Sequence, residues 1–551
     1  MKYLICLGHL PSFPFSRWRE KVPKADEGGT TEDDFAPPTA TLTRRAARAG
    51  LSRRRERRLG SGPMRAKLAA CCGLIIGAAI TQLACAEETI TAIVVQDSAP
   101  LRAAAKDSAQ QQAVLWQGDA LEVRGRRLDY LQVYDHRRER AGFVRAAQVR
   151  MLSLQPQDAP ELLAVVRFLR DTSGAEALGI GYAAAYLKAA PAGAIGAEPF
   201  DALGTMADRL ARRASTNRNN ANDGVIAAHL EVVASYGINI RSFEHDGRMQ
   251  LCYDGEAFRR VLALKSSDEG RARAALALTR QECIDPAITP VERANLDQWR
   301  AEVLDRAPRA NLPEYLKNRL RMRSAAVWAS IAFERTRHGD SAQEAANLAV
   351  QELTGVNKLE LTDDDLAAYN DAAMRVGASR WGAEPERTTT PAGLEIVTNQ
   401  GQPGETCIKL LDRKRDLAHP LLQRCTFGTV WTNSARTNPY GTALALAVQP
   451  LESWREMWLF HLAGDGWRID VVPPGDDAPE LGYIEFAGWV PGGKKMLAAR
   501  EVRSAGKFVH SFEVLDLETL AVQKRADNPQ ALSLFYRWQD PAWKGQTVSL
   551  R

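Results

Sequence analysis

The chain has 551 residues, of which 45% are hydrophobic and 25% charged, with 72 Lys and Arg against 67 Asp and Glu. Residues 1–86 hold 15 of the basic and 7 of the acidic residues, so the remaining 465 residues hold 57 and 60 and carry a net charge of −3. That balance argues against the basic surface of a nucleic-acid-binding protein, and the length suffices for roughly three domains.

Residues 64–86 have the three parts of a secretory signal peptide. A short basic start, Met64–Lys67, precedes the apolar run Leu68–Thr81, and Ala84-Cys85-Ala86 is typical of a cleavage site. The run is shorter than the roughly 20 residues of a membrane span. We therefore expect a periplasmic protein secreted through a cleaved signal peptide. Two alternatives stay open, an uncleaved inner-membrane anchor that faces the periplasm and a lipoprotein acylated on Cys85.

Residues 1–63 precede this leader and have the composition of a disordered, basic tail. They contain the run Arg53–Arg58 but no apolar periodicity. One interpretation is a basic arm for nucleic acid or anionic lipid. We favour the other, in which translation starts at Met64, so that the protein has no nucleic-acid partner and touches a membrane only through an uncleaved leader.

Residues 88–152 contain short alternating runs separated by turn residues, a pattern that predicts a small β-barrel. The pattern Leu115-x-x-Gly118-x-x-Leu121-x-Val123, followed by Tyr130-Leu131-x-Val133 and Gly142-Phe143-Val144, resembles the bacterial SH3-like (SH3b) domain. The resemblance implies contact with cell-wall peptides or envelope proteins. The aromatic residues that would line such a groove are Tyr130, Tyr134 and Phe143. In the alternative interpretation all three fill the barrel core.

Residues 157–382 predict an α-helical domain. Apolar spacing indicates helices over Pro160–Asp171 and Ala175–Ala190. The capping box at Thr289-Pro290-Val291-Glu292 opens a helix that runs to about Arg306 with Trp299 facing inward.

Further helix starts and one β-hairpin complete this domain. Ser341-x-x-Glu344 and Thr362 are each expected to begin a helix. A hairpin from Ile238 to Tyr253 interrupts the helices and turns at Asp246-Gly247.

Residues 393–551 predict a domain of antiparallel strands. A Trp followed by a turn recurs at Trp431, Trp489 and Trp538, and resembles the blades of periplasmic β-propellers. Three such units do not close a ring, so we expect an incomplete propeller or a stacked sheet. The fold class is multidomain α+β. The expected strands are 443–448, 457–462, 467–472, 483–487, 495–502, 509–516, 532–538 and 547–550.

Four cysteines follow the leader, and an even number in an exported protein predicts two disulfides. Pairing of nearest neighbours joins Cys252 to Cys283 and Cys407 to Cys425. The alternative is a catalytic thiol with His419 as its base, for which no motif is present. Metal-ligand spacings are also missing, and we predict no metal and no cofactor.

Three patterns that suggest chemistry have simpler explanations. Gly488–Lys494 matches a phosphate-binding loop but lacks the Ser or Thr ligand and precedes a strand, so we predict a turn. His338-Gly339-Asp340-Ser341 is explained by a helix cap at Asp340 or Ser341, and Asp476-Asp477 by loop charge. No catalytic residue is predicted.

Two functional hypotheses follow. The first is an exported, non-catalytic binding or scaffold protein of the cell envelope, whose SH3-like module contacts cell-wall peptides or envelope proteins. The second is a peptidoglycan or peptide hydrolase targeted by that module, with a buried acid such as Glu231 or Glu244 in the helical domain.

Overall fold

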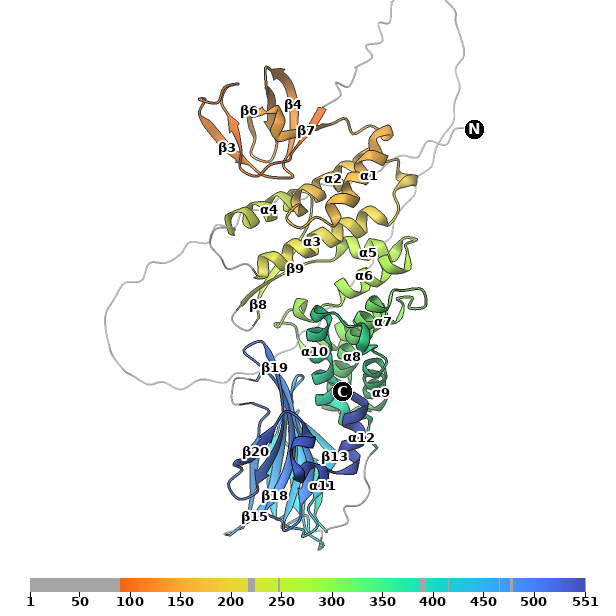
Figure 1. The fold of residues 1–551 in the computed structure, drawn as a ribbon, viewed down its shortest axis with the longest axis vertical. Helices are drawn as coiled ribbons and strands as arrows, with labels where there is room; N and C mark the ends of the chain where they lie inside the picture. The colour runs from red at the N-terminus through yellow and green to blue at the C-terminus, as the bar shows by residue number, and fades with distance from the viewer. Residues whose placement is uncertain are drawn as a thin grey trace, which may run out of the picture. The chain divides into compact units, whose positions relative to one another are not determined.

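A computed structural model describes residues 90–216, 223–245, 248–385, 393–414, 416–464, 466–475 and 479–550. The predicted tail and leader, the Asp246-Gly247 turn and Asp476-Asp477 lie outside these residues. The described part combines helices with antiparallel sheets (Figure 1), in agreement with the predicted mixture of α and β structure. None of its helices is long and apolar enough to cross a membrane.

The first sheet has seven antiparallel strands in the order β3-β2-β6-β5-β4-β1-β7. The edge strands β3 and β7 do not pair, so the sheet is open and the expectation of a closed barrel is wrong. Strand β2 joins β6 through one residue pair, Arg102 with Phe143, which leaves β3 at a free edge. The strands are Ile90–Val94 (β1), Ala99–Arg102 (β2), Gln111–Leu115 (β3), Ala120–Arg127 (β4), Tyr130–Asp135 (β5), Arg140–Arg145 (β6) and Val149–Leu152 (β7).

Ten helices and one hairpin occupy the described residues from 159 to 379. The hairpin pairs β8 (Ile240–His245) with β9 (Arg248–Tyr253), as predicted. The helices are Ala159–Arg170 (α1), Glu176–Ala189 (α2), Glu198–Thr216 (α3), Asp223–Ser235 (α4), Glu256–Ala263 (α5), Asp268–Leu278 (α6), Pro290–Asp305 (α7), Glu314–Arg337 (α8), Gln343–Thr354 (α9) and Asp363–Ser379 (α10).

Two of the three predicted N-terminal helix caps are confirmed. The Thr289–Glu292 capping box opens α7, and the Thr362 side chain accepts a hydrogen bond from the Asp365 backbone. The prediction for Ser341 and Asp340 is wrong, because α9 follows Ala342 and has no side-chain cap. The preceding Gly339 has a φ of +81° and belongs to the turn that ends α8.

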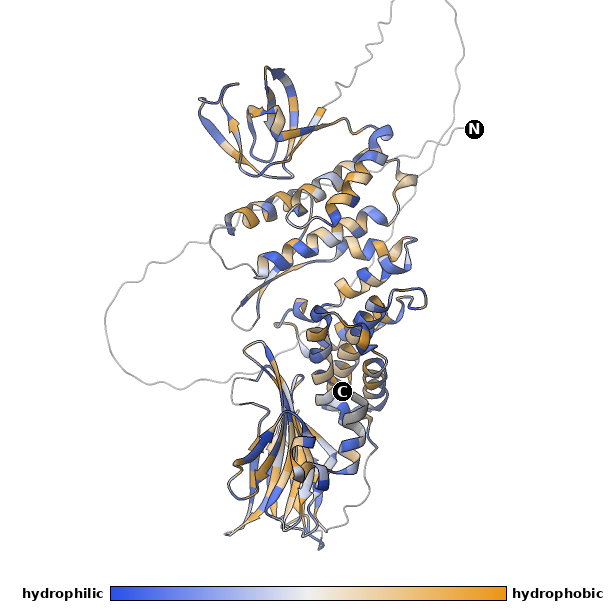
Figure 2. Ribbon diagram, viewed as in Figure 1, coloured by the Kyte–Doolittle hydropathy of each residue, from blue (hydrophilic) through white to orange (hydrophobic). Residues whose placement is uncertain are grey.

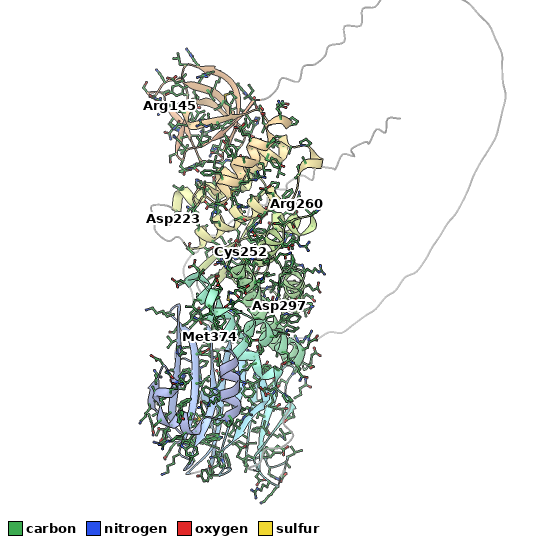
Figure 3. The ribbon with its side chains drawn as sticks, turned by 45° about the vertical axis from the view of Figure 1, so that its right-hand side comes forward. Arg145, Asp223, Cys252, Arg260, Asp297 and Met374 are labelled. Carbon is green, nitrogen blue, oxygen red and sulfur yellow. A yellow bond between two sulfur atoms is a disulfide. The ribbon has the colours of Figure 1, made fainter. Side chains whose placement is uncertain are left out.

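Helix α7 also corrects the prediction for Trp299, which is 36% exposed. The inward face of α7 instead carries Asp297 and Arg300, each about 1% exposed (Asp297 is labelled in Figure 3). Hydrophobic periodicity misses this arrangement because it assigns charged residues to the solvent side of a helix. Asp297 and Arg300 are buried as an ion pair with a separation of 2.5 Å.

The C-terminal region contains a three-stranded sheet and an eight-stranded sheet. In the larger sheet β15 divides two halves: Trp454 and Arg455 pair in parallel with β17, whereas Met457–Ala463 pair antiparallel with β16. Hydrophobic and hydrophilic residues mix along these strands (Figure 2). The strands are Glu395–Gln400 (β10), Thr406–Leu411 (β11), Leu422–Thr426 (β12), Thr429–Thr437 (β13), Ala443–Leu451 (β14), Trp454–Ala463 (β15), Gly466–Val472 (β16), Leu481–Val490 (β17), Lys495–Ser504 (β18), Lys507–Asp516 (β19) and Val522–Ala526 (β20).

The two last predicted strands are helices, α11 (Ser533–Trp538) and α12 (Pro541–Leu550). Leu532, Phe535 and Trp538 lie three residues apart, which is a helical spacing, and Phe535 is fully buried against Phe512. The Trp538 unit of the predicted repeat is therefore not a strand followed by a turn.

The other strand predictions from Ala443 to Asp516 fall within β14 to β19, and the Gly488–Lys494 pattern contains the turn between β17 and β18. Both predicted disulfides are present, Cys252–Cys283 and Cys407–Cys425. They agree with an oxidising compartment of the kind that exported proteins reach.

A chain of alternating charges connects the helices to the eight-stranded sheet. Glu452, at the tip between β14 and β15, contacts Arg293 of α7 at 2.7 Å and Arg375 of α10 at 3.5 Å. Arg293 continues to Asp297 and Arg300, all on α7. From Arg375 the chain continues through Asp371, Arg503 and Glu480.

We predict that Glu452→Ala destabilises the protein by about 3 kcal/mol, because it leaves two partly buried guanidinium groups without their shared carboxylate. Chemical denaturation of the purified chain measures this loss. The matched control is Glu344→Ala, whose side chain is 80% exposed and 3.7 Å from Arg335, and it should change stability by less than about 0.5 kcal/mol. Equal effects of the two substitutions would contradict the role of the charge chain.

Glu334 on α8 lies beside this series of paired charges. It follows Ser330 by one helical turn, and Ser330 donates a hydrogen bond to Glu452. Burial raises the pKa of Glu334, Glu452 raises it further, and Arg337, His338 and Arg293 oppose the shift. Its Oε2 atom is buried and has no hydrogen-bond partner among the described residues. The folded state therefore favours the protonated carboxyl group.

The stability that Glu334 contributes is present below the carboxyl group's ordinary pKa and is lost as the pH rises through its raised, folded-state pKa. Glu334→Gln should match the parent chain near pH 4 and exceed its stability near pH 8 by about 1 kcal/mol. Urea denaturation at the two pH values tests this. A variant that is less stable than the parent chain at pH 8 contradicts the prediction.

Candidate binding face on the N-terminal sheet

The three predicted aromatic residues lie on one face of the first sheet. Tyr130 and Tyr134 occupy alternate positions of β5, and Phe143 of β6 stands opposite Gln132. Since alternate residues of a strand share a face and directly paired residues do too, the three side chains belong together. The main core cluster of this sheet uses the opposite face of β5, with Leu131 and Val133. Tyr130 is nevertheless buried, at 6% exposed, as the core interpretation expects, whereas Tyr134 and Phe143 are partly exposed.

Tyr130 lies at one end of this face, together with a carboxylate and a guanidinium group. Its hydroxyl donates to Asp107 at 2.5 Å, and Arg145 holds the same carboxylate with two nitrogens. The Arg145 guanidinium lies 5.5 Å from the centre of the Tyr130 ring (Arg145 is labelled in Figure 3). The hydrogen bonds from Arg145 and Tyr130 lower the pKa of Asp107, and the bond to Asp107 raises the pKa of Tyr130.

Tyr134 has an equivalent environment four residues along the strand. The Arg124 guanidinium lies 4.1 Å from the centre of its ring, and Arg124 Nε donates to Glu122 at 2.8 Å. His136 contacts the other oxygen of Glu122 at 2.6 Å and meets the Tyr134 ring edge-on. Arg124 and His136 lower the pKa of Glu122. A tyrosine, an arginine and a carboxylate therefore recur twice on one face.

Between the two tyrosines the face carries Gln132, with Phe143 beside it on β6. Gln132 is exposed, and its partner on β4 is Gly125. Beyond Tyr130, Arg127 is exposed and makes no ion pair within the described residues, and Leu128 is 81% exposed at the β4–β5 turn. The face thus offers the partly exposed rings of Tyr134 and Phe143, guanidinium groups, an amide and one exposed apolar side chain.

Other residues of the sheet fix it against the helices. Ile93 packs in the same core cluster as α2 and α4, and Asp97 contacts buried His229 of α4 at 2.7 Å. Tyr236 donates to the carbonyl of Gly118 at 2.5 Å. Gly118 has a φ of +90°, and a Cβ atom there would lie 2.4 Å from the Ala177 carbonyl oxygen. This contact requires glycine.

The other candidates from the sequence are not assembled into a site. Glu231 has a side chain that is 76% exposed, and Glu244 is exposed too, so the expectation of a buried acid at either residue is wrong. The buried acids Glu176 and Asp201 are instead paired with arginines. Their charges stabilise the helical packing.

One small group within the described residues has the geometry of metal ligands, Glu405 with Cys407 and Cys425. Because the two sulfur atoms form a disulfide, they are not thiolates and do not offer metal coordination. His419 is 86% exposed and pairs with Asp416, so it is not positioned as a base for either cysteine.

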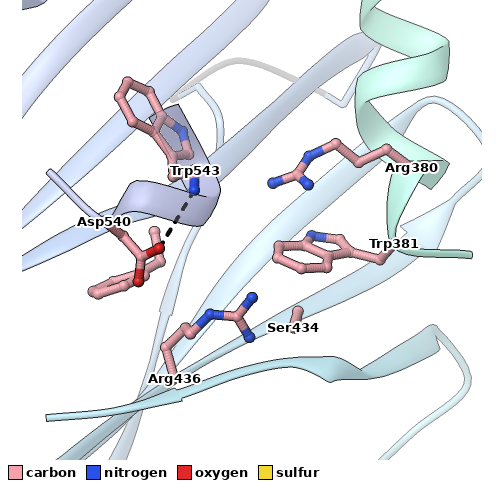
Figure 4. A pocket seen from close by; sticks show the side chains of 7 residues that line it. Arg380, Trp381, Ser434, Arg436, Asp540 and Trp543 are labelled. Atoms are coloured by element: carbon pink, nitrogen blue, oxygen red, sulfur yellow. Dashed lines mark hydrogen bonds between the residues drawn. The ribbon is translucent and has the colours of Figure 1, made fainter. Parts of the chain in front are cut away.

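A small pocket in the C-terminal region is lined by two arginines on either side of a tryptophan (Figure 4). The guanidinium of Arg380 lies 4.1 Å and that of Arg436 5.0 Å from the Trp381 ring centre. Arg380 binds Glu485 at 2.7 Å, and Trp543 of α12 donates to the same carboxylate. The cavity of about 10 Å³ has roughly the volume for one water molecule.

The buried carboxylate beside this pocket is electrostatically satisfied. Burial alone raises the pKa of Glu485, but Arg380 and Arg455 lower it to about 2. Arg455 also donates to the carbonyls of Gly377 and Ala378 at the end of α10. This cluster therefore joins the helices to the sheet.

No protein-family model, curated protein or solved structure matches this chain.

Sequence reasoning named the three aromatic residues but missed their charged neighbours. Arg124 and Glu122 are close in sequence to each other and lie on β4, whereas Asp107 reaches Tyr130 from the loop between β2 and β3. Alternation along β5 already placed Tyr130 and Tyr134 on the face opposite Leu131 and Val133. That signal does not show that Tyr130 is buried.

We predict that Gly118→Ala destabilises the protein by about 2 kcal/mol more than Gly174→Ala. Both glycines have a φ of +90°, but only Gly118 lacks space for a Cβ atom, and overpacking costs about 1–3 kcal/mol. Thermal or chemical unfolding of the two variants isolates the contact between the sheet and α2. Equal destabilisation would show that this contact is not tight.

Proposed function

We propose that this chain is an exported, non-catalytic binding or scaffold protein of the cell envelope, whose SH3-like N-terminal sheet contacts cell-wall peptides or envelope proteins. The observation that carries the proposal is the face bearing Tyr130, Tyr134 and Phe143 with two guanidinium groups stacked near the tyrosine rings. Exposed polar and aromatic groups that a rigid scaffold positions are typical of binding sites.

The chemistry of this face suits a peptide. Aromatic rings bury apolar side chains of a ligand, guanidinium groups bind carboxylates or carbonyl oxygens, and the Gln132 amide both donates and accepts hydrogen bonds. The ion pairs to Asp107 and Glu122 hold both arginines in place before a ligand arrives. Such preorganisation reduces the entropy lost on binding.

Periplasmic localisation is part of the proposal. The leader-like sequence at 64–86 and the two disulfides support it. The helices and the propeller-like C-terminal strands act in this proposal as a scaffold that holds the binding face. Their buried charge clusters support a rigid role because each connects several elements.

The test is capture of partners from envelope extracts, and of soluble cell-wall stem peptides, by the immobilised chain from residue 87 onward. Tyr134→Ala should weaken binding at least 10-fold, because it removes the ring and the contact that orients Arg124. The matched control is Tyr536→Ala, a tyrosine that is 75% exposed on α11, and it should bind as the parent chain does.

Two outcomes contradict the proposal. If Tyr134→Ala leaves binding unchanged, or if the chain captures nothing above background, this face is not the binding site. Release of soluble fragments from purified peptidoglycan by the chain contradicts the non-catalytic assignment and favours the hydrolase.

A further inference from the structure

The two tyrosine–arginine–carboxylate groups on the N-terminal sheet define more than a general peptide site. They stand at Tyr130 and Tyr134, four residues apart along β5. Each group has a guanidinium within 5.5 Å of a ring centre. This repeat indicates both the charge of the ligand and the distance between the ligand groups that it binds.

The guanidinium groups keep hydrogen-bonding capacity for a ligand. A guanidinium carries five N–H donors. The only hydrogen bond that Arg124 makes within the described residues is through Nε to Glu122. Arg145 uses Nε and one terminal nitrogen on Asp107. Arg127, paired with Tyr130 across β4 and β5, makes no ion pair within the described part of the chain.

Charge on the face favours an anionic ligand. The register places Arg102, Arg124, Arg127 and Arg145 around the tyrosines, against the carboxylates of Asp107 and Glu122. Residues 90–152 hold 10 Lys and Arg and 7 Asp and Glu, a net charge of +3. The rest of the chain after residue 86 holds 47 and 53, a net charge of −6. The positive charge is therefore concentrated on the sheet that carries the face.

The spacing matches an extended peptide. Four residues of a strand span about 13 Å at roughly 3.3 Å per residue. A ligand in the same extended conformation places its residues i and i+4 on one side and at the same separation. Its residue i+2 then falls over Gln132, between Gly125 of β4 and Phe143 of β6.

We propose that the N-terminal face binds an extended acidic peptide segment in which two carboxylate side chains lie at positions i and i+4, one beside Arg124 and the other beside Arg145 and Arg127. This proposal rests on the proposed function, since it names the ligand of the same face. The bond type is a charge-assisted hydrogen bond between guanidinium and carboxylate. The partly exposed Tyr134 ring contacts the peptide, whereas the buried Tyr130 donates to Asp107, which in turn holds Arg145.

The probes are three fluorescein-labelled heptapeptides with the sequences Gly-Glu-Ala-Ser-Ala-Glu-Gly, Gly-Gln-Ala-Ser-Ala-Gln-Gly and Gly-Glu-Ala-Ser-Glu-Ala-Gly. Their binding to the chain from residue 87 onward is measured by fluorescence anisotropy at low and moderate salt. The first peptide should bind at least 10-fold more tightly than the other two, and its affinity should fall as salt increases.

Protein variants assign the effect to the face. Arg124→Gln and Arg127→Gln should each weaken binding of the first peptide about 5- to 10-fold. The control Arg212→Gln alters an arginine that is 53% exposed and paired with Asp208 on α3, and it should leave binding unchanged. Circular dichroism confirms that each variant is folded.

The outcomes separate this inference from the proposed function. Equal affinity for the Glu and Gln peptides, or for the two Glu spacings, overturns the acidic-peptide assignment while Tyr134-dependent capture from envelope extracts still stands. Tight binding of a DNA duplex that competes with every peptide also overturns it. The face would then recognise negative charge in general and not the separation between two carboxylates. Loss of both kinds of binding overturns both proposals.

Discussion

The arrangement of this protein depends on arginine–carboxylate pairs buried between its elements. Glu452 contacts both α7 and α10 from the tip of a hairpin, and Glu485 contacts the end of α10, β15 and α12. Removing a charge from water is costly, and good geometry with further hydrogen bonds offsets that cost. Buried ion pairs of this kind fix orientation, because each charge is satisfied in only one arrangement.

The same interaction appears at the binding face in an exposed form. Asp107 holds Arg145 near Tyr130, and Glu122 holds Arg124 near Tyr134. In water such pairs contribute little to stability. Their effect here is to orient guanidinium groups beside aromatic rings on a sheet that is itself fixed to α2 and α4. Arginine–carboxylate pairs therefore occur both in buried positions between the elements and in exposed positions at the proposed binding face.

The sequence predicted features whose signals are local. The Thr289 capping box, the β8–β9 hairpin and the strands between Ala443 and Asp516 depend on neighbouring residues. Both disulfide pairings followed from the even number of cysteines and their proximity in sequence.

The features that the sequence did not predict depend on distant contacts. Asp297 and Arg300 point inward because Arg293, Glu452 and the Thr279 carbonyl lie there to receive them. The sequence predicts strands at 532–538 and 547–550 because short apolar runs do not distinguish strands from helices. The partners of Tyr130 at the binding face also come from a loop and another strand.

We propose that this protein binds its ligand at the face around Tyr130 and Tyr134. Hydrogen–deuterium exchange of the chain from residue 87 onward, with and without the peptide Gly-Glu-Ala-Ser-Ala-Glu-Gly, tests this proposal. We expect the bound peptide to slow exchange only in strands β4, β5 and β6 and in the loop that contains Asp107. Protection centred on α10, β17 and α12, with none on the first sheet, would contradict it.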